Sequence, residues 1–131
     1  MTILSLFTAQ ILILIYTIIT FGFSAIEKLL EWNKNIGFYK NHFNKTFLKN
    51  NIPFLLKLVI ILEFITVITC VVGLLILIVF SEKEIGFYGL IIAAITLIGL
   101  MFGQRIAKDY TGAMNITIYF ILTIIGIFML Q

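Results

Sequence analysis

Glu63 is the residue whose position most clearly suggests chemistry, because it is an acid inside a long apolar segment. At about 1.5 Å of helix per residue, it lies roughly 15 Å beyond Pro53, near the middle of a bilayer if that helix crosses one. A charged carboxylate at this depth is costly, so it should face other helices, pair with a base or carry a proton. Its role is either structural, as a hydrogen-bonded packing group, or functional, as a proton relay or the polar anchor of a ligand pocket.

Polar residues at helical spacing are expected to surround this acid. Thr66 lies about one turn further along the same helix, and Asn115 and Tyr119 lie one turn apart in the last apolar segment. Threonine and asparagine side chains in such segments hydrogen-bond across helix contacts. We therefore predict a candidate intramembrane polar site formed by Glu63, Thr66, Asn115 and Tyr119.

A second group of polar residues gathers where apolar segments end. Glu27 and Arg105 stand at two such ends, where an ion pair would tie the first helix to the third, and Lys28 is the third candidate for these pairs. Gln104 and Arg105 directly follow an apolar segment and are placed to form the lip of a pocket. The remaining members are Lys108, Asp109 and Tyr110, and we interpret Lys108 and Asp109 mainly as solvated loop charges.

Metal and thiol chemistry find little support in the sequence. His42 is the only histidine and Cys70 the only cysteine, so neither a histidine pair nor a CxxC motif exists. We interpret His42 as a polar residue at the level of the lipid headgroups. No phosphate-binding loop, zinc spacing or nucleophile arrangement occurs, and we expect no metal site, no cofactor held by this chain and no catalytic activity of its own.

The composition defines the environment in which these residues must be positioned. Of the 131 residues, 62% are hydrophobic and 11% are charged, and the mean hydropathy is +1.18. A soluble domain carries roughly 25% charged residues. The chain is therefore expected to have the lipid bilayer as its partner and not to bind nucleic acid. It is not expected to be a soluble enzyme or a disordered tail.

Four apolar segments are long enough to cross a bilayer, which takes about 20 residues in a helix. They run from about 3–25, 53–80, 85–103 and 113–130, and each carries small or polar residues at helical spacing. We predict a single all-α domain, an integral membrane protein built as a bundle of four transmembrane helices. The first segment is too long, and lacks the early basic residues, for a cleavable signal peptide.

The basic residues predict an orientation. Lys28, the five lysines that follow it up to Lys57, Arg105 and Lys108 all belong to the first and third connections, and Lys83 alone belongs to the other side. Connections rich in Lys and Arg stay in the cytoplasm. We therefore expect the first and third connections in the cytoplasm and both termini on the outer side of the membrane.

The connection over about 32–48 has its own helical pattern. Trp32, Ile36, Tyr39, Phe43 and Phe47 recur at spacings of 4, 3, 4 and 4, with lysines and asparagines between them. We interpret the segment as an amphipathic helix in the headgroup layer, with its aromatic residues at the membrane interface. The alternative is a helix that covers the cytoplasmic end of the bundle.

Several motifs together resemble the DoxX-like family of small bacterial membrane proteins. They are Ala25-Ile26-Glu27-Lys28-Leu29, then Pro53 followed by Leu62-Glu63 and Gly73-Leu74, and the run from Phe102 through Gln104, Arg105, Lys108 and Asp109 to Gly112. The similarity covers nearly the whole chain in order. Ala25 stands where the family motif has glycine, and Val67 and Val71 replace small residues that follow the acid in many members.

This resemblance implies a four-helix protein of the bacterial inner membrane, whose outer side is the periplasm, and directs attention to Lys28 and Glu63. The founding member is a subunit of a quinone-reducing thiosulfate oxidoreductase, whereas most relatives have no settled activity. Our first hypothesis is a non-catalytic accessory or anchoring subunit of a larger membrane complex, with other membrane proteins as partners. The alternative is a quinone-linked redox component that uses the pocket around Glu63. A small transporter or lipid-handling protein ranks last.

Overall fold

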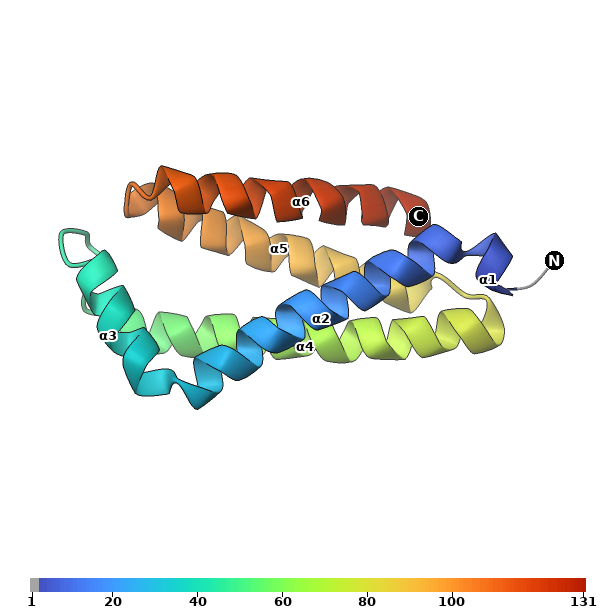
Figure 1. Ribbon diagram of the computed structural model, residues 1–131, viewed down its shortest axis with the longest axis horizontal. Helices are drawn as coiled ribbons and strands as arrows, with labels where there is room; N and C mark the ends of the chain where they lie inside the picture. The colour runs from blue at the N-terminus through green and yellow to red at the C-terminus, as the bar shows by residue number, and fades with distance from the viewer. Residues whose placement is uncertain (1–2) are drawn as a thin grey trace.

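The computed structural model describes residues 3–131, and those residues form helices joined by short connections (Figure 1). The elements are α1 (Ile3–Leu6), α2 (Thr8–Leu30), α3 (Trp32–His42), α4 (Ile52–Phe80), α5 (Glu84–Ile106) and α6 (Tyr110–Leu130). Within the described residues no strand occurs, and α2, α4, α5 and α6 are each long and apolar enough to cross a membrane. The predicted all-α bundle of four transmembrane helices is confirmed.

The helix ends follow local signals in the sequence. Pro53 lies in the first turn of α4, where its missing N–H costs nothing. The same helix ends at Phe80, and the next residue, Ser81, has a left-handed φ of 59°. Asp109 caps the start of α6, where its Oδ1 accepts a hydrogen bond of 2.9 Å from the backbone N–H of Gly112. These signals place α6 three residues earlier than the predicted start at 113, and α5 continues three residues past the predicted end at 103.

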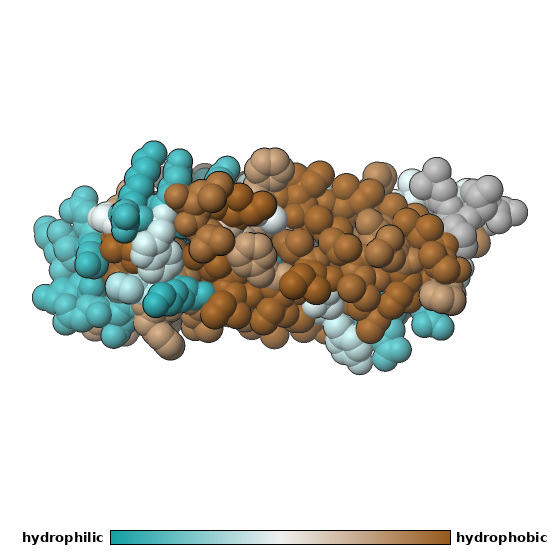
Figure 2. Space-filling view, turned by 90° about the horizontal axis from the view of Figure 1, so that it is seen from below, coloured by the Kyte–Doolittle hydropathy of each residue, from teal (hydrophilic) through white to brown (hydrophobic). Residues whose placement is uncertain are grey.

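The surface is divided as a bilayer requires. Figure 2 shows a broad hydrophobic region between hydrophilic residues, which are most extensive at the end where α3 lies. Large apolar side chains such as Phe23, Ile68 and Ile98 point outward from the helices. In water such a surface would cause aggregation, whereas lipid covers it without cost. The molecule is therefore a multi-pass membrane protein.

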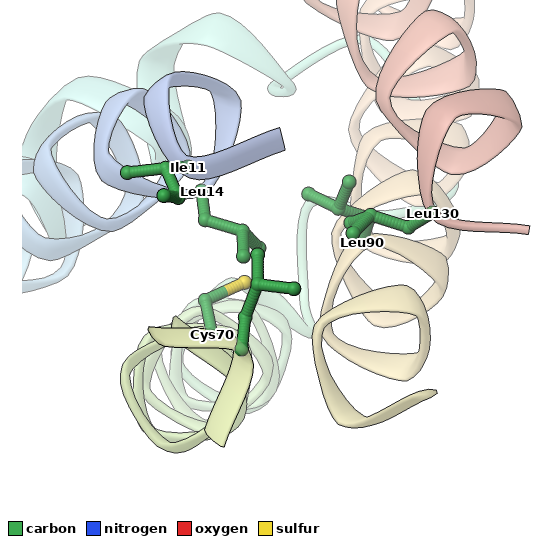
Figure 3. Close-up of a cluster of buried hydrophobic side chains, with 6 residues drawn as sticks. Ile11, Leu14, Cys70, Leu90 and Leu130 are labelled. Atoms are coloured by element: carbon green, nitrogen blue, oxygen red, sulfur yellow. The ribbon is translucent and has the colours of Figure 1, made fainter. Parts of the chain in front are cut away.

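A compact core lies toward the end of the bundle opposite α3. Leu14 of α2, Cys70 of α4, Leu90 of α5 and Leu130 of α6 are buried and belong to one cluster, which Figure 3 shows from close by. Because side chains from all four long helices meet there, this cluster fixes their relative positions.

Two glycines bring α4 and α5 into very close contact near this core. A Cβ atom on Gly73 would lie 2.5 Å from the backbone nitrogen of Gly86, and a Cβ on Gly89 would lie 2.8 Å from Cys70 Sγ. Small residues at these positions allow the close approach that stabilises helix pairs in lipid. From this contact α4 and α5 diverge toward α3, as Figure 1 shows.

The small and polar residues at helical spacing are buried on the two central helices, apart from the half-buried Gly103 near the end of α5, and only partly buried on the others. Buried stripe residues on α4 and α5 are Glu63, Thr66, Cys70, Gly73, Gly89, Ala93 and Thr96. On α2, Thr17 is buried but Glu27 is exposed, and on α6, Thr123 and Gly126 are buried.

The inward position expected for Asn115 and Tyr119 is wrong, because both side chains are exposed on α6. This helix packs on α5 and α2.

The segment α3 lies across the hydrophilic end of the bundle (Figure 1). It ends at His42, several residues before the predicted end at 48, and none of its residues is fully buried. Tyr39 and the following Phe43 are half-buried and turn toward the diverging helices, whereas Phe38 and Phe47 are exposed. The helix therefore has an inner aromatic face that covers the end of the bundle and an outer aromatic face available to lipid.

Candidate functional site

The centre of the candidate site is a buried ion pair between α2 and α4. Lys28 Nζ lies 3.0 Å from Glu63 Oε1, and the two side chains are 14% and 1% exposed. The angles at this contact are not those of a hydrogen bond, so Oε1 has no hydrogen-bond donor among the described residues. Lys28 also donates a hydrogen bond to Ser24 Oγ, one turn earlier on α2. The structure thus supplies the base that the buried position of Glu63 demands.

Tyr39 approaches this pair from α3. The pKa of its phenol is raised above the ordinary value of 10.0, first because burial disfavours the phenolate and second because the negative charge of Glu63 repels it. The hydroxyl is therefore neutral at physiological pH and can donate a hydrogen bond. Among the described residues it has no hydrogen-bond partner.

A cavity of about 310 Å³ lies between α3, α4 and α5, in the space left where α4 and α5 diverge. Lys28, Tyr39, Thr96 and Gln104 are its polar lining residues. Thr96 Oγ1 is occupied, since it donates to the carbonyl of Ile92. The apolar lining includes Phe43, Leu56, Val59, Leu62 and Leu100. An apolar cavity with few polar groups is typical of small-molecule sites, which span roughly 300–1,000 Å³.

The structure brings together only part of the predicted intramembrane site. Glu63 and Thr66 are buried on the same face of α4, and Thr66 Oγ1 donates to the carbonyl of Leu62 on its own helix. Asn115 and Tyr119 are exposed on α6 and take no part in it. Glu63 itself does not line the cavity, and the charged group that does so is its partner, Lys28.

The predicted ion pair between Glu27 and Arg105 is also not formed among the described residues. Glu27 is exposed, and the guanidinium of Arg105 lies 4.9 Å from the ring centre of Tyr110, as a cation–π contact. Lys28, the third candidate, pairs with Glu63 instead. Lys28 and Glu27 are adjacent and therefore point in different directions on the helix, so only one of them faces the bundle.

His42 has a structural role that its interpretation as a headgroup-level residue did not include. Its Nε2 lies 3.1 Å from Gln104 Oε1 and 3.6 Å from Asp109 Oδ2, so it ties the end of α3 to the end of α5 and the start of α6. Its ring also stacks on Phe38 and meets Phe43 edge to face. These contacts hold α3 over the cavity. Gln104 lines that cavity, which agrees with its expected position at the lip of a pocket.

The predicted interface aromatics divide between two environments. Trp32 is half-buried with Lys57 Nζ 6.0 Å from its ring centre, and Phe47 is exposed. Tyr39 and Phe43 line the cavity instead. Their spacing predicted one helical face but did not show that part of this face covers a cavity.

The fold and site thus define a multi-pass helical membrane protein with a buried ion pair beside an apolar cavity. Comparison of the chain with family models, curated proteins and solved structures finds no match. The similarity to DoxX-like proteins therefore rests on the sequence motifs alone. No group of three or more potential metal-binding residues occurs among the described residues.

We expect the ionisation of Tyr39 to be visible in the stability of the protein at alkaline pH. A group whose pKa is raised by folding contributes stability that is complete below its unfolded pKa, here about 10, and is lost as the pH rises through the folded value. Thermal unfolding followed against pH should therefore show a steep alkaline loss in the wild type and a shallower one in Tyr39→Phe. Tyr110→Phe, a control at an exposed tyrosine, should retain the steep loss. Identical profiles for the wild type and Tyr39→Phe would contradict the burial argument.

Proposed function

We propose that the protein is a quinone-linked membrane component that binds the head group of a lipid-soluble quinone in the cavity between α3, α4 and α5. The observation that supports this is that Lys28 and Tyr39, whose side chains end in hydrogen-bond donors, line a largely apolar cavity. A quinone head has complementary chemistry, because it is a flat apolar ring with carbonyl oxygens that accept hydrogen bonds.

The charge state of the site favours an uncharged head group. Lys28 and Glu63 neutralise each other, so an anionic ligand would meet no net positive charge at the ion pair. An ammonium has three N–H donors. One is directed to Ser24 and the ion pair engages Glu63, which leaves a donor for a ligand oxygen.

In this proposal the chain's own residues bind and orient the head group. Reduction of a quinone to its quinol takes two electrons and two protons. The electrons would come from a partner redox protein, because the sequence contains no cofactor motif. Lys28 and Tyr39 would donate to the carbonyl oxygens as negative charge develops on them.

The binding proposal is tested by removing a single hydroxyl. Tyr39→Phe should weaken binding of a prenylated benzoquinone by about fivefold to tenfold, the effect of losing one hydrogen bond. Binding would be measured by extraction and mass analysis of quinone retained on the protein over a titration in lipid nanodiscs. Tyr110→Phe, which makes the same change outside the cavity, should bind as the wild type does. A wild-type protein that retains no quinone would contradict the proposal.

A role as accessory subunit is the second candidate, and the outer face of α6 favours it. Asn115 and Tyr119 are exposed there, one turn apart. Amide and hydroxyl groups on membrane helices form hydrogen bonds to neighbouring helices. Other membrane proteins that co-purify in fixed ratio with the wild type, and that are lost from Asn115→Leu, would support this role; their retention would contradict it.

We also propose a location in a bacterial inner membrane, with the α3 end in the cytoplasm and both termini outside. The excess of Lys and Arg at the α3 end supports this orientation. In a Cys70→Ser background, Phe47→Cys should react with an impermeant thiol reagent only after the membrane is opened, and Glu82→Cys should react in intact cells. The reverse pattern would contradict the orientation.

A further inference from the structure

The cavity extends to the outer surface of the bundle between α4 and α5. Among its lining residues, Leu58 of α4 and Phe102 of α5 are 43% and 61% exposed, and Gly99 of α5 is exposed as well. A Cβ atom on Gly99 would meet nothing within 4 Å, so the space beside this glycine is open. The cavity therefore has an open side on the flank of two membrane-spanning helices.

The hydrophilic end of the cavity, in contrast, is covered. Tyr39 and Phe43 of α3 line it from that end, and a Cβ on Gly103 of α5 would lie 3.6 Å from the Phe43 ring. The contacts of His42 with Gln104 and Asp109 hold this cover in place. The route from water thus crosses packed aromatic side chains, whereas the route from lipid passes a glycine.

The size of the cavity points to how a ligand would lie in it. At about 310 Å³ it is at the lower limit of small-molecule sites, which is enough for a ring head group but leaves no room for a long prenyl chain. A tailed ligand whose head reaches Lys28 must therefore extend its tail out of the cavity. The open flank at Gly99 leads the tail into the hydrocarbon layer, where burial of each CH₂ is favourable.

From these observations we infer that the opening formed by Leu58, Gly99 and Phe102 is a lateral portal, through which a prenylated quinone enters from the bilayer and in which its tail remains. This inference rests on the proposed function, since it assigns the entry route and the tail position for the same ligand. Gly99 is then a specificity-determining position, because its missing side chain provides the space that the tail occupies.

The test fills the portal and compares two probes, a long-chain prenylated benzoquinone and the same benzoquinone head without a tail. Gly99→Leu places a branched side chain in the space of the tail and should weaken binding of the tailed probe by about tenfold or more. Binding of the tail-less probe should change by less than about twofold, because the head site at Lys28 and Tyr39 is untouched. Gly99→Ala, which adds one methyl group, should have an intermediate or smaller effect on the tailed probe.

Gly37→Leu provides the matched control. Gly37 lies on α3, its Cβ position is equally open, and it does not line the cavity, so both probes should bind as they do to the wild type. If Gly99→Leu binds the tailed probe normally, the portal is wrong although the quinone site stands. If Gly99→Leu loses both probes equally, Gly99 belongs to the head site and the portal is again wrong. If the wild type binds neither probe, the proposed function itself fails.

Discussion

Replacing Lys28 with methionine is expected to destabilise the protein by about 3–5 kcal/mol, the effect of removing one partner from a buried ion pair. Glu63 is 1% exposed, and the Lys28 ammonium at 3.0 Å is its only ion-pair partner among residues 3–131. Methionine fills a volume similar to that of the lysine stem but leaves the carboxylate without a positive charge. The free energy of unfolding, measured in detergent micelles with a chemical denaturant, should fall accordingly.

The double variant Lys28→Met/Glu63→Met tests whether the loss comes from the unpaired charge. Replacement of a whole buried pair by apolar residues of similar volume is often neutral or stabilising, so the double variant should recover most of the stability lost by the single one. Lys49→Met removes an exposed lysine of the connection before α4 and should stay within about 0.5 kcal/mol of the wild type. A double variant as unstable as Lys28→Met would show that Lys28 stabilises the fold by packing and not by its charge.

The transmembrane helices were predictable because the bilayer restricts the choices so strongly. A segment that crosses lipid must satisfy its backbone hydrogen bonds internally, so a long apolar run has to be a helix. The predicted runs over 53–80 and 85–103 correspond to α4 and α5, with shifts of up to three residues at their ends. Part of the buried faces of these two helices was also predictable, because small and polar residues recur on them at helical spacing and allow the helices to approach closely.

The partner of Glu63 was not predictable in the same way. The burial of this acid follows from its depth alone, whereas the identity of its base depends on the angle at which α2 crosses α4 (Figure 1). The sequence offered Lys28 together with Glu27 and Arg105 as candidates for ion pairs at the helix ends, without a partner deeper in the membrane. The family resemblance directed attention to Lys28 and Glu63, but it did not predict that the two residues form an ion pair.

The error at Asn115 and Tyr119 has a physical cause as well. Helical periodicity shows which residues share a face, but it does not show whether that face meets protein or lipid. Thr123 and Gly126 of α6 are buried where this helix packs on α5 and α2, whereas Asn115 and Tyr119, which precede them at helical spacing nearer the start of α6, are exposed. The cavity was hidden for a related reason, since it arises from the divergence of α4 and α5 and has no signature in either helix alone.

Gly73→Ala and Gly99→Ala are expected to change stability in opposite directions, although the substitution is the same and both glycines lie inside helices. At Gly73 the new methyl group would lie 2.5 Å from the backbone nitrogen of Gly86, and backbone atoms cannot move aside as a flexible side chain can. The helices α4 and α5 must separate, which should lower the free energy of unfolding by about 1–3 kcal/mol or more.

At Gly99 nothing lies within 4 Å of the new methyl group, so only the helix propensity changes, and alanine should stabilise the protein by up to about 1 kcal/mol. Both variants would be compared with the wild type by the same denaturant titration in micelles, with Gly37→Ala as a third open position on α3. Equal effects at Gly73 and Gly99 would mean that the close contact of α4 with α5 does not determine the geometry of the bundle. Opposite effects would show that the contact between Gly73 and Gly86 sets the point from which α4 and α5 diverge. The cavity lies where the two helices have diverged, so it would then depend on two glycines that do not line it.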